Sequence, residues 1–175
     1  MNPLELMQIH PVFPAVVVDD ADDDAMQTGD VISMENYEDC LILIAYGDGT
    51  ATSGDIEVTV NQGTDIAFGT NKALNALQTG RIFEKVNAAT LAAVGQWTEV
   101  TQAVADEVYT DADSGEECGM IALWVKASDL DVDNGYKCIR ADLSAITSAK
   151  LVSAFYILTN PKYASAPDEM QSALR

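Results

Sequence analysis

The chain has 175 residues, a hydrophobic content of 48% and a formal net charge of -19, which comes from 28 acidic and 9 basic side chains. This length predicts one domain that can bury a core without disulfides or metals, and the hydrophobic content excludes a disordered acidic tail. The shortage of Lys and Arg argues against a phosphate backbone and against an anionic membrane surface as partners.

The N-terminal segment has the character of an extended arm. Residues 1–14 carry several apolar side chains around Pro11 and Pro14, which remove backbone donors and favour extended structure. We predict an arm that lies on its own domain or on a neighbour. The run 15–18 is β-branched and predicts the first strand, and the aspartate run 19–24 predicts a solvated loop. The segment shows no pattern of a secretory signal and no stretch of ~20 apolar residues, so we expect cytoplasmic synthesis.

Two segments in the middle of the chain have clear strand patterns. Residues 41–46 (LILIAY) are continuously apolar, which is typical of a strand buried on both faces. Residues 56–61 (IEVTVN) alternate between apolar and polar, which is typical of a half-buried strand. Residues 88–94 favour a short helix, and residues 72–77 are open to a strand or a helical turn. Further strands are expected over 30–33, 64–68, 81–86 and 97–104.

The C-terminal part continues this pattern. Residues 106–117 are acidic and predict a loop, and residues 120–126 (MIALWVK) predict a core strand that buries Trp124. A hairpin-type dipeptide, Asn134-Gly135, follows. Two more strands are expected over 136–143 and 150–158.

Short strands with turn signals between them predict an all-β fold. The expected architecture is an antiparallel β-sandwich, jelly-roll-like or barrel-like, with extended N- and C-terminal arms. The predicted boundaries are an arm over 1–14, the sandwich over 15–160 and a second arm over 161–175.

The cysteines and the single histidine point to no reactive site. Cys40, Cys118 and Cys138 lie in apolar runs, and no C-x-x-C pair occurs, so we expect reduced core residues. His10 is the only histidine, which leaves a zinc site or a Ser–His pair without support. We expect it to pack at an interface or to face solvent.

One loop partly matches a calcium-binding pattern. Asp129, Asp131 and Asp133 occupy its first, third and fifth positions, but the pattern needs Gly at the sixth and Glu at the twelfth. Those positions are Asn134 and Arg140. A solvated hairpin loop is therefore the favoured interpretation, and no metal ligands are assigned.

No catalytic or cofactor-binding residues are assigned either, and we expect a protein that is not an enzyme. No nucleophile motif or phosphate-binding loop occurs, and Gly47-Asp48-Gly49 is interpreted as a turn. Carboxylate pairs are abundant, but among 28 acidic residues they carry no information. A hydrolase with paired carboxylates remains an alternative.

Several phrases of the sequence together resemble small head proteins of tailed bacteriophages, the decoration or cement proteins. The resemblance runs over most of the chain, roughly residues 11–170. The phrases are PVFPAVVV, EDCLILIAYGDGT with GDIEVTVNQGTDIAFGTNKAL, ASDLDVDNGYKCIRADLS and FYILTNPKYASAPDEM.

The resemblance implies a β-sandwich or barrel that docks on the outside of a capsid and stabilises the shell. Its implied partners are the major capsid protein and copies of itself, with a homotrimer favoured over a dimer, and its implied location is the virion exterior. The alternatives are a tail, neck or minor head protein, or an acidic carbohydrate-binding β-sandwich module. From the two arms, we expect partner contacts at Leu6, Ile9, Phe13, Pro161 and Tyr163.

Overall fold

The computed structural model describes residues 6–18, 27–47, 54–88, 95–112, 118–144 and 150–163. These residues form eleven strands and two short 3-10 turns. The strands are β1 (Met7–Val18), β2 (Ile32–Ser33), β3 (Tyr37–Tyr46), β4 (Ile56–Gly63), β5 (Asn71–Ala73), β6 (Ile82–Ala88), β7 (Trp97–Glu99), β8 (Val108–Asp111), β9 (Cys118–Lys126), β10 (Cys138–Leu143) and β11 (Lys150–Pro161). The turns are η3 (Ala127–Asp129) and η4 (Val132–Asn134).

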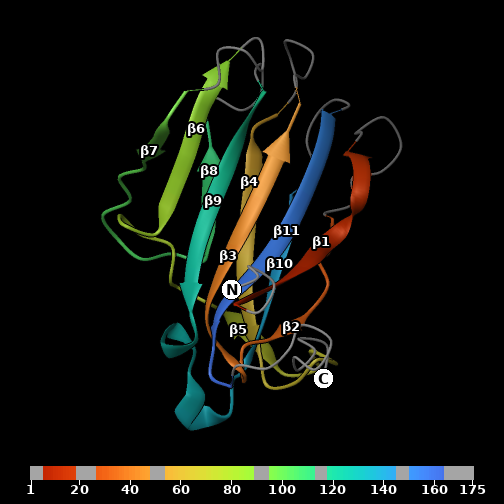
Figure 1. Cartoon of the computed structure of the whole chain (residues 1–175), viewed down its shortest axis with the longest axis vertical. Helices are drawn as coiled ribbons and strands as arrows, with labels where there is room; N and C mark the ends of the chain where they lie inside the picture. Colours follow the sequence, from red (N-terminus) through yellow and green to blue (C-terminus); the bar gives the residue numbers. More distant parts are fainter. Residues whose placement is uncertain are drawn as a thin grey trace.

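The strands form two antiparallel sheets packed as a sandwich, which confirms the predicted fold class. The six-stranded sheet has the order β1-β11-β3-β9-β6-β7, and the second sheet has the order β2-β10-β4-β5, with β8 paired to β4. Figure 1 shows the six-stranded sheet in front and β4, β8 and β10 behind it, with η3 and η4 at the lower end. In the part of the chain that the structure describes, no helix is long and apolar enough to cross a membrane.

The core lies between the sheets and follows the alternation read from the sequence. Ile56, Val58 and Val60 of β4 are fully buried, as the period of two predicts. In β3, the inward side chains Ile42 and Ile44 are also fully buried. Apolar side chains from both sheets therefore meet in one continuous core.

The first strand begins at Met7, whereas the sequence predicts its start at Ala15. Residues 7–11 pair in continuous register with residues 155–159 of β11, so most of the predicted arm 1–14 is an edge strand of the sandwich. Prolines are tolerated there because an edge strand has one side without ladder hydrogen bonds. The C-terminal boundary is described only to Tyr163, and residues 164–175 lie outside the described residues.

Other strand predictions also need correction. Residues 64–68 form a turn closed by hydrogen bonds from the Phe68 amide to Asp65, and not a strand. The acidic segment 106–117, expected as a loop, contains β8. The strand expected over 97–104 ends at Glu99, and most of the helix expected over 88–94 lies outside the described residues.

The three cysteines are free and buried, as predicted. Cys40 is 0% exposed, and burial raises the pKa of its thiol and of the Cys138 thiol. The thiolate is the nucleophilic form of cysteine. We therefore expect the native protein to react negligibly with Ellman's reagent. In denaturant, all three thiols should react, with release of three equivalents of thionitrobenzoate per chain. Rapid reaction of any thiol in the native state would contradict this burial.

Candidate interaction face

The outer side of the six-stranded sheet is mostly apolar, and we call it the outer face. Strand registers place Pro11, Phe155, Leu43, Ala122 and Phe83 directly opposite one another across five strands. The neighbouring row contains Ile9, Ile157, Leu41 and Trp124. The apolar side chains of the outer face are Ile9, Pro11, Leu41, Leu43, Ala45, Phe83, Met120, Ala122, Trp124, Leu151, Phe155 and Ile157.

No layer of the described chain covers this face, although Leu41, Leu43 and Phe83 are partly buried and Ala122 is 5% exposed. Leu151, Ile9 and Phe155 are 65%, 54% and 39% exposed. An antiparallel sheet with one solvated face normally places polar side chains on it, and contiguous exposed apolar patches mark interaction sites. The sequence 41–46 predicts burial on both faces, yet only the inner side of β3 is buried, because no layer of the described chain covers the outer side.

The opposite sheet provides an internal comparison. Its outward positions on β4 and β10 are polar and include Glu57, Thr59, Asn61 and Arg140. Arg140 pairs with Asp142, with Nη2 2.8 Å from Oδ2. One outer side of the sandwich therefore has an ordinary solvated composition, and the other has the composition of a contact surface.

The sheet edges are poorly suited to recruiting another strand. The long edge strand β1 contains Pro11 and has register irregularities between Pro11 and Phe13 and between Phe13 and Val16. The strands β2, β5, β7 and β8 at the other edges have two to four residues. Prolines, bulges and short edges block strand addition, which favours contact through the outer face over pairing at an edge.

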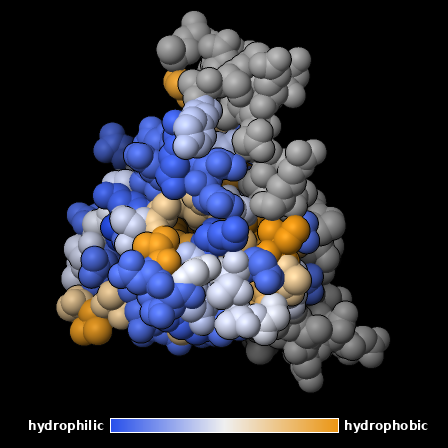
Figure 2. Space-filling model, turned by 90° about the horizontal axis from the view of Figure 1, so that it is seen from below, coloured by the Kyte–Doolittle hydropathy of each residue, from blue (hydrophilic) through white to orange (hydrophobic). Residues whose placement is uncertain are grey.

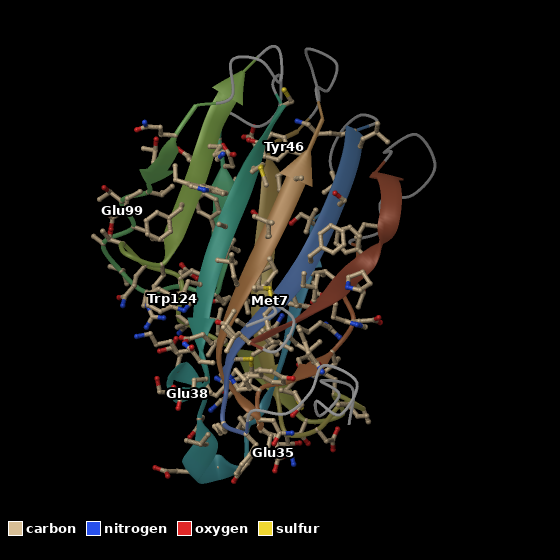
Figure 3. The ribbon with its side chains drawn as sticks, in the orientation of Figure 1. Met7, Glu35, Glu38, Tyr46, Glu99 and Trp124 are labelled. Carbon is tan, nitrogen blue, oxygen red and sulfur yellow. The ribbon has the colours of Figure 1, made fainter. Side chains whose placement is uncertain are left out.

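A groove of about 460 Å³ lies beside the lower end of the outer face, and Trp124, Glu38, Asp39, Lys126 and Lys162 are among the residues that line it. Figure 3 shows Trp124 low on the six-stranded sheet, above Glu38, and Tyr46 at the upper end. The indole Nε1 of Trp124 donates to Asp39 Oδ1 at 3.0 Å. Trp124 is therefore a half-buried surface residue, and its prediction as a core residue is wrong.

Cations already lie against the Trp124 ring. The Arg81 guanidinium is 4.7 Å and the Lys126 ammonium 4.5 Å from the ring centroid. Cation–π contacts of this kind contribute about 0.5–1 kcal/mol at exposed sites. They occupy the ring surface on which a sugar would stack, which disfavours carbohydrate binding through Trp124.

Four of the five predicted contact residues gather at one corner of the sandwich. Leu6 and Ile9 lie at the start of β1, and Pro161 and Tyr163 lie at the end of β11, because Met7 is opposite Thr159. Leu6 is 44% exposed and Tyr163 is 76% exposed. We call these four residues the β1–β11 corner. Phe13 is different: it is 6% exposed and belongs to the core, so it is not available as a surface contact.

The lower end of the molecule is mixed in polarity. Figure 2 shows it as a mainly hydrophilic surface with separate hydrophobic patches.

His10 is on the inward side of β1, opposite Tyr156, with its Nε2 3.5 Å from Asp30 Oδ2. Since this nitrogen is buried and makes no hydrogen bond to the described residues, His10 is a packing residue at the sandwich edge.

Two of the three aspartates of the calcium-like loop, Asp129 and Asp131, are bound by other groups of the protein. Asp129 contacts Arg81 and accepts a hydrogen bond from the Lys126 amide at 2.8 Å. Lys72 and the Asn134 amide group bind Asp131 and hold the pKa of its carboxyl below its ordinary value. Among the described residues, no three His, Cys, Asp or Glu side chains are placed to hold a metal ion together.

A buried polar cluster between the sheets was not predicted from the sequence. The Tyr46 hydroxyl donates to Asp111 Oδ2, and the Tyr109 hydroxyl donates to Glu84 Oε2, both at 2.8 Å. Burial, followed by the nearby Asp111 charge, raises the pKa of Tyr46, which keeps its hydroxyl protonated as a donor. These bonds connect β3 and β6 of one sheet to β8 of the other.

Comparisons with known proteins identify no family. No protein-family model and no curated protein matches the chain. Among solved structures, the chain is similar to the SPBc2 prophage-derived protein YomS, with a TM-score of 0.46 and 10% sequence identity over 88% of this chain and 93% of that chain.

Proposed function

We propose that this protein is a structural virion component, a decoration protein that docks on the outside of a phage capsid and stabilises the shell. In this proposal it performs no catalysis and carries no cofactor. It is made in the bacterial cytoplasm, and its partners are the major capsid protein and copies of itself.

The observation that carries the proposal is the β1–β11 corner. The exposed side chains Leu6 and Ile9 lie at the start of β1, and Tyr163 follows the end of β11, the strand with which β1 pairs. Clustered apolar side chains can form the core of a protein contact. Many such contacts repeated over a lattice give strong attachment from individually weak sites. The resemblance of residues 11–170 to decoration proteins points to the same role.

Co-sedimentation with shells of the cognate phage that lack this protein tests the proposal. We expect saturable binding at a number of copies set by the local symmetry axes of the shell. The double variant Leu6→Ser with Tyr163→Ser should raise the concentration needed for half-saturation at least about tenfold, because both exposed apolar contacts are lost.

The matched control is Val104→Ser, which alters a side chain that is 76% exposed in the crossover from β7 to β8. Its binding curve should overlay that of the unmodified protein. Absence of saturable binding would overturn the decoration role and favour a tail or neck component. If Val104→Ser weakened binding to the shells as much as the double variant, the β1–β11 corner would not be the contact surface.

A further inference from the structure

The outer face has a defined size that can be compared with known interfaces. Five strands about 4.8 Å apart and three side-chain rows about 6.7 Å apart cover roughly 24 by 20 Å, or about 480 Å². Two such faces in contact would bury about 1,000 Å², which reaches the lower limit for a specific interface. A single face is therefore large enough to support a weak but specific association.

The charge distribution indicates what kind of surface would cover it. The chain has a net charge of -19, yet the charged side chains of the described residues lie only at the margins of the outer face. Arg81 and Lys85 lie over the rings of Trp124 and Trp97 at the β6–β7 side, and Glu99 is opposite Phe83. A strongly basic partner would find no matching carboxylates among these apolar rows. A second copy presents the same rows, which carry no charge on β1, β11, β3 and β9 and have Arg81 and Lys85 only at the β6 end, and depletion of charge is typical of an interface core.

We propose that the outer face pairs with the same face of a second copy, forming a two-fold symmetric dimer by sheet-on-sheet packing. The shielded edges direct the copies to meet through this face rather than through a continuous sheet. Stacked sheets pack about 10 Å apart with interdigitating side chains. Such an isologous contact closes at two copies, in contrast to the trimer that the sequence resemblance favours.

This pairing does not depend on the capsid role, since it concerns the purified protein alone.

The proposed dimer should also respond to salt in an unusual direction. Two copies that each carry -19 repel one another, and salt screens this repulsion. The dimer should therefore tighten as the NaCl concentration rises, whereas an association held by ion pairs would weaken.

Sedimentation velocity of the full chain from about 1 μM to about 1 mM covers the range in which interfaces of this size dissociate. We expect the mass to rise from 18.7 kDa toward twice that value. Phe155→Lys should raise the dissociation constant at least about tenfold, because it places a charge in the middle row of the face, next to Leu43 of the central strand β3. Val104→Lys adds the same charge away from the face and should leave the constant unchanged.

Leu43→Lys, in the same row, provides a second variant if Phe155→Lys does not fold, with circular dichroism as the check on folding. A monomer at every concentration would overturn the proposal, as would a three-copy species. The proposal would also be overturned if the face variants and Val104→Lys had equal dissociation constants. Dissociation of the dimer on addition of NaCl would overturn it as well.

Discussion

Gly29→Ala is expected to destabilise the fold by about 3 kcal/mol, because the site leaves no space for a side chain. A Cβ at this position would lie 2.1 Å from the Ala141 carbonyl oxygen and 2.7 Å from Val12 Cγ1. The oxygen belongs to the backbone of β10, so it cannot rotate away. The Gly29 amide also donates to Asp142 Oδ1 at 3.0 Å, and any displacement of the segment would lengthen this buried hydrogen bond.

Chemical denaturation of the variant, followed by circular dichroism, measures this effect. Gly69→Ala is the matched control, since a Cβ there would meet nothing within 4 Å. The control should unfold within about 0.5 kcal/mol of the unmodified protein. An equally small effect of Gly29→Ala would show that the loop before β2 does not pack against β10 as described.

Tyr156→Phe is expected to lower the free energy of unfolding by about 1–3 kcal/mol, because buried backbone groups lose their partner. The Tyr156 hydroxyl accepts a hydrogen bond from the Ala141 amide at 2.7 Å and donates one to the Asp30 carbonyl at 3.0 Å. Burial raises the pKa of this hydroxyl, so it stays protonated. One side chain of β11 thus connects the six-stranded sheet to β10 and to the segment before β2.

Urea unfolding curves at neutral pH would measure the loss. Tyr163→Phe makes the same chemical change at a residue that is 76% exposed, and we expect it to be nearly neutral. Coincident midpoints for Tyr156→Phe and the unmodified protein would contradict the role of the hydroxyl in joining the sheets.

The strands with a clear hydrophobic period were predictable from the sequence. The alternation of residues 56–61 identifies β4, and the apolar run 120–126 identifies β9. Local pattern is sufficient there because the core imposes one period on the whole strand. The local pattern fails at β1, where Pro11 and Pro14 led us to predict an extended arm. It also fails at β8, whose strand structure depends on pairing partners that are distant in the sequence. Tyr109 and Asp111 of β8 are buried through pairing with β4 and through Tyr46.

The apolar composition of the outer face was predictable from the sequence, but its exposure was not. The run LILIAY correctly indicates a strand that is apolar on both sides, but one sequence cannot show which layer covers each side. The packing of the sandwich determines that Ile42 and Ile44 face the core and that Leu41 and Leu43 face outward. Trp124 was misassigned for the same reason, since burial of an apolar strand does not fix the face of each residue.

In the associated state, we expect the surface of a second copy to cover the outer face. A thiol placed in this face would report its coverage most directly, since the native cysteines are buried. We would measure the labelling rates of Leu43→Cys and Val104→Cys with a thiol reagent across protein concentrations. We expect Leu43→Cys to react more slowly as the protein concentration rises, while Val104→Cys keeps a constant labelling rate. A Leu43→Cys rate that does not change with concentration would contradict coverage of the outer face.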